Sequence, residues 1–311
     1  MENYVTLLDS YFLPQGIALH KSMVRRIINF KLWILCMDEE SFELLKKINL
    51  PMVELLNLKD FENEELLSIK KKRKINEYCW TLTPFLPDFV FGMDSTLERV
   101  TYIDADLWFL KDPKEIFLEF EKSYKNILIT SHSYNAKYDQ TYKSGRFCVQ
   151  FIIFNKYKSQ YIRDWWKSKC IEWCFDYYED GKLGDQKYLD SWPNLFYDDV
   201  HILEQKNFAL APWNCQVYPY GEAVFFHFQG LRISSKTTIS IGLYEFPQVV
   251  IENLYLPYFS DLKSSIELMC EHNFRFIVQT NRITIFKKIK NILYLMKYFI
   301  IEKFRSGELK F

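Results

Sequence analysis

Apolar residues in this chain occur in short runs, and the stretches between these runs have apolar positions at helical spacing. Runs of about four to eight apolar residues bounded by polar ones are typical of buried strands, whereas an i, i+3, i+4 pattern is typical of amphipathic helices. We expect strands at residues 4–8, 32–37, 52–56, 100–103, 127–130, 146–155 and 224–228, and helices at 16–28, 39–48 (N-capped by Asp38), 62–91 (broken near Pro84 and Pro87), from Asp112, and at 158–178. Strands that alternate with helices predict an α/β fold with a mixed, mostly parallel sheet flanked by helices.

Two carboxylates one residue apart, Asp104 and Asp106, follow the expected strand at 100–103. In largely parallel sheets ligands bind beyond the carboxyl ends of the strands, where Asp9 also falls. Carboxylates that face a cavity are costly unless a cation neutralises them, and such oxygen ligands suit Mg²⁺ or Mn²⁺, which in turn holds a nucleotide diphosphate. The alternative is a solvated junction of strand and turn, because Asp-x-Asp alone is a common sequence.

The composition limits the function classes without selecting one. The 311 residues suffice for one large α/β domain or a domain with a small appendage, and the 40 basic and 40 acidic residues balance, so no nucleic-acid partner is expected. The chain has only nine glycines and no Gly-rich phosphate motif after the first strand, which argues against a dinucleotide or P-loop site. The aromatic content of 18% fits a large core and sugar-stacking surfaces.

Cysteine usage and the N-terminus indicate the cellular compartment. The seven cysteines are an odd number at irregular spacings with no Cys-x-x-Cys pair, which predicts reduced thiols. The N-terminus lacks the pattern of a signal peptide, and no run of about 18 apolar residues occurs. We therefore expect a cytoplasmic protein.

The C-terminal segment 282–311 differs from the rest of the chain in charge. Eight basic residues stand against Glu302 and Glu308, and apolar residues mark a broad helical face. This pattern predicts a basic amphipathic helix on an anionic membrane surface, which would make the protein peripheral at the inner face of the cytoplasmic membrane. The alternatives are a helix packed on the domain and a dimer contact. We expect a domain at 1–257 and a helical extension at 258–311.

Three further positions carry polar side chains where elements end. His227 lies in an apolar run before a turn with Gly230, a pattern that fits a core histidine or a metal ligand. Asp185 and Gln186 open an expected helix, where Asp185 is an N-cap or a functional carboxylate and Gln186 contacts a sugar. Gly230 and Arg232 offer a backbone donor and a guanidinium for a diphosphate.

The order of these motifs (Asp-Ser-Tyr, Asp-x-Asp, Asp-Gln, His-x-x-Gly) over roughly residues 3–235 resembles that of glycosyltransferase family eight, the retaining galactosyl- and glucosyltransferases of the GT-A (Rossmann-like) fold. The resemblance implies a nucleotide-diphosphate sugar as donor, with a UDP-sugar favoured. It also implies Mn²⁺ ligands at Asp104, Asp106 and His227, donor-sugar contacts at Asp185 and Gln186, and nucleoside contacts at Asp9 and Tyr11.

Several positions depart from the family pattern. Lys187 stands where a third carboxylate is usual, only Arg232 is near the usual place of a lysine, and the strand at 146–154 lacks the usual Asn-Ala-Gly or Asn-Ser-Gly. The chain looks more similar to uncharacterised bacterial glycosyltransferase-like proteins, in the stretches at 77–84, 179–190 and 210–214. The resemblance therefore supports the fold and the reaction class more strongly than the identity of the sugar or the stereochemistry of the reaction.

The mechanism that the resemblance implies is electrostatic. The metal, with Arg232 and Arg73 of the basic run 70–74, stabilises charge on the nucleotide diphosphate leaving group, although most of that run is expected to be a solvated helix face. Retaining transfer, which the resemblance favours, places Gln186 near the anomeric carbon. Inverting transfer requires a base, for which Asp185 is the candidate.

Gln150, Trp213 and Asn214 are the candidates for acceptor contacts, with packing as the more common role of such a Trp. We expect a glycosyltransferase that extends a bacterial surface glycan (capsule, lipooligosaccharide or O-antigen) on a glycan or lipid-linked saccharide acceptor. One alternative is a catalytically silent GT-A-fold protein that binds a glycan or lipid. Another is a sugar nucleotidyltransferase, which requires a Gly-rich, Arg-containing loop that residues 8–14 do not supply.

Overall fold

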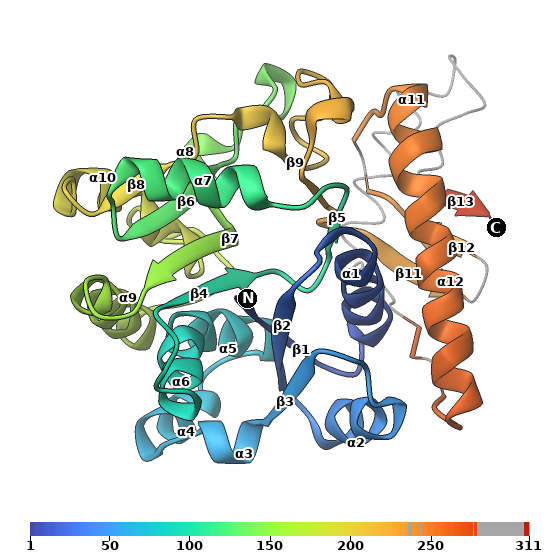
Figure 1. Ribbon diagram of the computed structural model, residues 1–311, viewed down its shortest axis with the longest axis horizontal. Helices are drawn as coiled ribbons and strands as arrows, with labels where there is room; N and C mark the ends of the chain where they lie inside the picture. Colours follow the sequence, from blue (N-terminus) through green and yellow to red (C-terminus); the bar gives the residue numbers. More distant parts are fainter. Residues whose placement is uncertain (236–237, 243, 276, 279–307, 311) are drawn as a thin grey trace.

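The computed structural model describes residues 1–235, 238–242, 244–275, 277–278 and 308–310 (Figure 1). The strands are β1 (Glu2–Leu8), β2 (Phe30–Cys36), β3 (Val53–Asn57), β4 (Arg99–Ile103), β5 (Leu107–Phe109), β6 (Ile127–Ser131), β7 (Phe147–Asn155), β8 (Val200–Ile202), β9 (Ala209–Leu210), β10 (Phe225–His227), β11 (Arg232–Ser235), β12 (Thr238–Ser240) and β13 (Glu308–Lys310). The α-helices are α1 (Leu13–Arg26), α2 (Glu39–Ile48), α3 (Leu58–Phe61), α4 (Glu64–Lys70), α5 (Ile75–Leu82), α6 (Leu86–Met93), α7 (Lys114–Ser123), α8 (Thr141–Ser144), α9 (Gln160–Glu172), α10 (Trp192–Leu195), α11 (Gln248–Val250) and α12 (Leu256–Glu271).

A seven-stranded sheet lies at the centre, in the order β3-β2-β1-β4-β7-β6-β8. Four of its neighbouring pairs are parallel, whereas β7 runs antiparallel to both β4 and β6. The connection from β6 to β7 contains a 3₁₀ turn (Ala136–Tyr138) and the four-residue α8 but no crossover helix, which suits an antiparallel pair. The expected mixed, mostly parallel α/β sheet is confirmed.

Alternating side chains give the sheet two apolar faces. On β1, Tyr4 and Leu8 pack with α1, α2 and α7, whereas Val5 packs on the other face with α5, α6 and α9. In Figure 1, α1 and α5 accordingly lie on opposite sides of β1 and β2. A sheet that is covered on both faces requires nearly continuous apolar strands, which explains the runs seen in the sequence.

Two regions expected to be helical differ in the structure from the sequence prediction. The region at 62–91 is divided into α4, α5 and α6, with a first break at 71–74, where Arg73 donates to the Ile171 carbonyl at the end of α9 (3.2 Å). The expected breaks at the two prolines fall in a 3₁₀ turn and in the first turn of α6, positions that tolerate a missing N–H. The helix expected at 158–178 ends at Glu172, because Trp173 adopts an extended backbone.

Helix α12 packs along α1 (Figure 1), and Asp261 holds it there by accepting a hydrogen bond from Trp108 Nε1 (2.7 Å) and pairing with Arg25. Strand β13 pairs antiparallel with β12. Residues 282–307 and 311 lie outside the described residues, so the basic helix and its membrane contact stay predictions, as does the division at 257. No helix in the described parts of the chain is long and apolar enough to cross a membrane.

Candidate active site

The Asp pair is held at the carboxyl end of β4, beside β7. The Asp104 amide donates to the Gln150 carbonyl (3.1 Å), which continues the ladder one residue past the strand, and Leu107 N–H then closes a turn onto the Asp104 carbonyl (3.2 Å). Tyr102, two residues earlier and on the same side of β4, donates its hydroxyl to Asp104 Oδ1 (2.9 Å). A buried strand and a turn thus fix both carboxylates.

His227 reaches the same place from a second sheet, in the order β5-β10-β9. β10 runs antiparallel to β5 with His227 opposite Leu107, and the Phe228 amide donates to the Asp106 carbonyl (3.0 Å). This register brings His227 Nε2 to 3.1 Å from Asp106 Oδ1 and 3.5 Å from Asp104 Oδ2. Residues more than 120 positions apart therefore form one cluster.

Burial and mutual charge perturb every member of this cluster. Burial, together with the Asp106 charge, raises the pKa of Asp104 to about 6, although His227 opposes the shift. Burial also acts to raise the pKa of Asp106, but the charge and hydrogen bond of His227 outweigh it and hold that pKa below its usual value. Burial acts to lower the pKa of His227, and the two carboxylates more than reverse this. The three groups thus behave as one buried ionic unit.

A third carboxylate, Asp185, adds to the negative charge. Its side chain is buried, its Oδ2 has no hydrogen-bond partner, and its pKa is raised to about 7 by burial and then by the Asp104 charge. Gly184 precedes it with φ +55, and a Cβ on Gly184 would lie 3.2 Å from the Trp80 ring. Glycine is favoured here because the left-handed backbone and the close approach of the Trp80 ring would both strain a larger residue.

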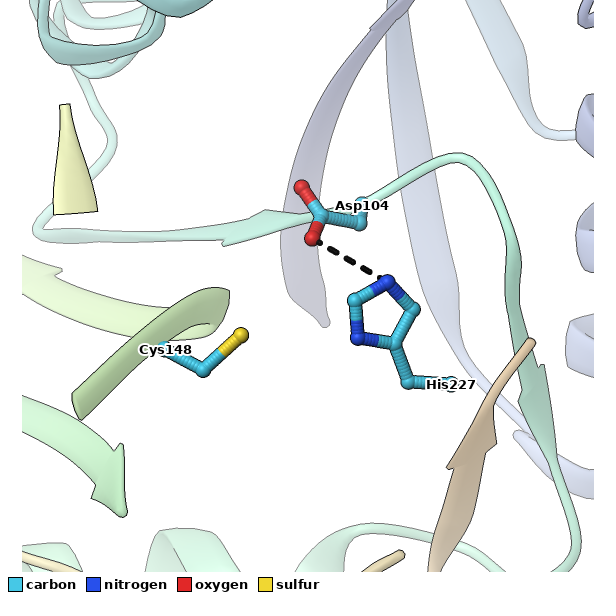
Figure 2. Close-up of side chains that lie close together, drawn as sticks. All are labelled: Asp104, Cys148 and His227. Atoms are coloured by element: carbon cyan, nitrogen blue, oxygen red, sulfur yellow. Dashed lines mark ion pairs between the residues drawn. The ribbon is translucent and has the colours of Figure 1, made fainter. Parts of the chain in front are cut away.

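The ligand atoms of this cluster fit a divalent cation. Oxygen atoms from Asp104 and Asp106 and a ring nitrogen of His227 converge. With the imidazole in its neutral form, this is a donor set that Mn²⁺ accepts. A cation there would offset the cost of burying adjacent carboxylates, of which Asp104 and Asp185 carry raised pKa values. Figure 2 shows a further group: Cys148 on β7, whose Sγ lies within 4.8 Å of ligand atoms of Asp104 and His227.

Sequence reasoning missed Cys148 as a member of this cluster. The departure from the Asn-Ala-Gly or Asn-Ser-Gly pattern lies in the same stretch, and positions 148 and 150 share one face of β7 by strand alternation. Only the pairing of β7 with β4, with Ile103 opposite Phe151, shows that this face adjoins the Asp pair.

The nucleoside candidates lie at the end of β1. Asp9 Oδ1 accepts from the amides of Tyr11 and Phe12 (both 3.1 Å), and its pKa is raised by burial and by Asp38. Tyr11 is 48% exposed and is thus accessible to a ligand. Burial and the charges of Asp9, Asp185 and Asp38 together raise the pKa of Cys79, which indicates that these carboxylates gather near it.

The diphosphate candidates follow β10. Gly230 has φ +80, which a turn after His227 requires, and Arg232 lies close enough to lower the pKa of Asp106 by its charge. Arg73, by contrast, stacks on the Phe175 ring (3.8 Å) and bonds to the end of α9. The nucleotide-binding roles of all three stay predictions.

The remaining candidates are held by backbone contacts. Gln186 donates to the Ser144 carbonyl (2.9 Å). Trp213 and Asn214 are buried, and both donate to the His132 carbonyl (2.8 and 3.0 Å), while the Trp213 ring meets the His227 ring edge-on at 5.6 Å. Gln150 is 1% exposed and contacts His227. Their catalytic and acceptor-binding roles stay predictions.

Solved structures with a similar fold are glycosyltransferases. They include GlyE of Streptococcus pneumoniae TIGR4 in its apo form (TM-score 0.54, 15% identity, 90% of this chain and 66% of that chain). They also include the galactosyltransferase LgtC in complex with donor and acceptor sugar analogs (0.52, 12%, 84% and 95%) and mouse xyloside xylosyltransferase 1 (0.50, 14%, 74% and 98%). The chain therefore has the GT-A glycosyltransferase fold.

The sequence relatives are bacterial. The chain is 33% identical over 251 residues to the uncharacterized protein YfnF of Bacillus subtilis (strain 168), which covers 75% of this chain and 82% of YfnF. It is 29% identical over 256 residues to the uncharacterized protein YfnD of the same strain, with 77% and 81% covered. The chain belongs to the family of YfnF. No protein-family model matches the sequence, and membership of glycosyltransferase family eight stays a prediction.

Proposed function

We propose that this protein is a metal-dependent glycosyltransferase that moves a sugar from a nucleotide-diphosphate sugar, with a UDP-sugar favoured, to a glycan or lipid-linked saccharide. The observation that carries the proposal is the convergence of Asp104, Asp106 and His227 within 3.5 Å contacts at the carboxyl end of β4. This is the edge of an α/β sheet at which ligands bind. The GT-A fold of the chain supports the same reaction class.

In this proposal the cation and the protein side chains have separate roles in the reaction. A Mn²⁺ or Mg²⁺ ion bound by these three side chains supplies positive charge for the diphosphate leaving group. Arg232, whose charge reaches Asp106, adds a second positive group on the same side. Gln186, held by the Ser144 carbonyl, lies next to Asp185 along the chain and contacts the donor sugar in this proposal. Retention, which we favour from the resemblance to glycosyltransferase family eight, requires no strong protein base, whereas inversion would use Asp185, whose raised pKa of about 7 suits a general base.

The acceptor in this proposal is a growing surface glycan, such as capsule, lipooligosaccharide or O-antigen. The family of YfnF is found in a bacterium, which is consistent with such an acceptor. The buried Trp213 ring lies 5.6 Å from the His227 ring, and the half-buried Tyr134 ring lies 6.0 Å from the Trp213 ring. In this proposal Tyr134 provides aromatic surface for the acceptor.

Thermal stabilisation by nucleotides tests the proposal. The protein is melted with and without Mn²⁺ in the presence of UDP, GDP, CMP or dTDP, and Asp106→Ala serves as the control. A ligand at about 100 times its Kd adds about 2.7 kcal/mol of stability by mass action. We expect a shift with UDP that requires Mn²⁺ and is absent in the variant. The absence of any shift with every nucleotide, with or without metal, would favour a silent glycan- or lipid-binding protein instead.

A further inference from the structure

A chain of buried hydrogen bonds begins behind His227 and runs into the sheet. His227 Nδ1 lies 2.8 Å from Gln150 Oε1, Gln150 Nε2 donates to Thr130 Oγ1 (3.3 Å), and Thr130 Oγ1 donates to the Cys148 carbonyl (3.4 Å). Thr130 is fully buried, and Gln150 and His227 are 1% and 5% exposed. The residues come from β6, β7 and β10, so this series of hydrogen bonds connects the Asp104, Asp106 and His227 cluster to the central sheet.

The Cys148 carbonyl, the last acceptor, fixes the direction of every hydrogen bond in this series. A backbone carbonyl only accepts, so Thr130 must donate its single hydroxyl proton to Cys148. Thr130 Oγ1 then accepts from Gln150, which must present its NH₂ group to Thr130 and its oxygen to His227. The Gln150 oxygen only accepts, so Nδ1 of His227 must carry a proton. Hence the amide orientation follows from the network.

The opposite ring nitrogen faces the carboxylates. With Nδ1 committed as a donor, the lone pair available for a cation is on Nε2, the atom 3.1 Å from Asp106 and 3.5 Å from Asp104. Metal-binding histidines donate their other ring N–H to an outer partner that sets ring orientation. We infer that Gln150, itself oriented by Thr130, is a positioning residue that holds His227 with Nε2 directed at the cation site. The metal part of this inference rests on the proposed function.

Gln150 stands on the strand where the family motif is absent. Residues 146–154 lack the Asn-Ala-Gly or Asn-Ser-Gly of glycosyltransferase family eight. A glycine or alanine at position 150 would provide no side-chain acceptor for Nδ1. The buried amide of Gln150 supplies that acceptor in this chain.

Two matched pairs of variants test the inference. Gln150→Leu removes the acceptor at similar volume, whereas Gln150→Glu keeps an oxygen that accepts from Nδ1, and Thr130→Val is paired with Thr130→Ser. The first readout is the ring Hδ1 proton of His227, measured by NMR with ¹⁵N-labelled histidine, without metal and with Mg²⁺. His227→Gln assigns the signal among the five histidines. The second is the affinity for Mn²⁺ alone, measured by electron paramagnetic resonance.

We expect an exchange-protected Hδ1 signal in the wild type, Gln150→Glu and Thr130→Ser, and its loss in Gln150→Leu. Mn²⁺ affinity should fall by about 10–100-fold in Gln150→Leu, less in Thr130→Val, and little in the two conservative variants. An unprotonated Nδ1 in the wild type, or equal Mn²⁺ affinities for Gln150→Leu and Gln150→Glu, would overturn the inference. A protected Hδ1 without Mn²⁺ binding would support the role of Gln150 as acceptor and contradict the metal site of the proposed function.

Discussion

The two ends of β4 carry charged clusters of opposite character. At the amino end, Arg99 pairs with Glu2 and with Glu121 (3.0 Å), and all three side chains are partly exposed to water. At the carboxyl end, Asp104 and Asp106 are largely buried with His227 as their only described cationic contact within 4.0 Å. Each end combines two carboxylates with one basic side chain, but the carboxyl-end cluster is more deeply buried, so water screens its excess negative charge less.

This difference separates a structural role from a functional one. Exposed ion pairs contribute little to stability and require no ligand. Buried like charges are costly, and in the proposed function a divalent cation offsets this cost at the ligand-binding edge of the sheet. Three tests of this contrast follow, in order of decreasing expected effect.

Removal of one negative charge at either end of β4 should give the largest difference in turnover between two variants. Asp104→Asn should lower the rate of Mn²⁺-dependent UDP-sugar turnover by about 100-fold or more, because removal of a metal ligand costs more than the 10–100-fold of an outer partner. Glu121→Gln, a change of the same charge at the other end, should leave turnover within about twofold. Steady-state assays of UDP release measure both. Equal losses in the two variants would remove the distinction between the ends.

The pH dependence of the stability of Asp185→Asn tests how much free energy the burial of this carboxylate costs. The folded pKa of Asp185 is about 7 and its ordinary value is 3.8, so the folded state retains a proton that the unfolded state releases between these values. The wild type should therefore lose stability as pH rises from about 4 to about 7, by up to about 1.4 kcal/mol per pH unit from this group. Asp185→Asn should be more stable than the wild type at pH 8, and the difference should shrink toward pH 4.

Urea unfolding of both proteins across this pH range, in chelator to exclude metal, measures the difference. The exposed Asp60, changed to Asn, serves as the surface control. A constant difference between Asp185→Asn and wild type at all pH values would contradict the assignment of a buried, proton-retaining carboxyl group.

Arg99→Met gives the smallest expected effect. It breaks both ion pairs of the amino end but keeps an apolar side chain over the Phe117 ring, so we expect a loss of about 1 kcal/mol in the free energy of unfolding. Turnover of UDP-sugar by the folded variant should match the wild type. Urea unfolding and activity assays separate the two effects, and a large loss of turnover without a loss of stability would contradict a purely structural role.

Local patterns in the sequence predicted much of the fold. The alternation of strands and helices, the Asp38 cap (Oδ1 to the Ser41 amide, 2.8 Å) and the Asp pair after β4 follow from short-range rules of periodicity, capping and strand ends, and the structure has each of them. The end of α9 at Glu172 was missed because the aromatic residues that follow it have apolar spacing that still looks helical.

The rest depends on contacts that are distant in sequence. The side-chain environment of His227 is set by the register of β10 on β5 and by the pairing of β7 with β4, neither of which a local pattern encodes. For the same reason the sequence did not reveal that Cys148 and Gln150 lie beside the His227 imidazole, and the acceptor role of Gln150 stays a prediction. The candidate site residues could be predicted individually from local patterns. Their mutual orientation depends on how the strands pair in the folded sheets.

The central claim is that the carboxyl end of β4 holds a divalent cation. Its most direct test is a crystal structure with Mn²⁺ and UDP, with anomalous scattering measured at the manganese edge. We predict one strong anomalous peak between the carboxylates of Asp104 and Asp106 and Nε2 of His227, next to the diphosphate. A nucleotide bound at this edge without a manganese peak among these three side chains would contradict the claim.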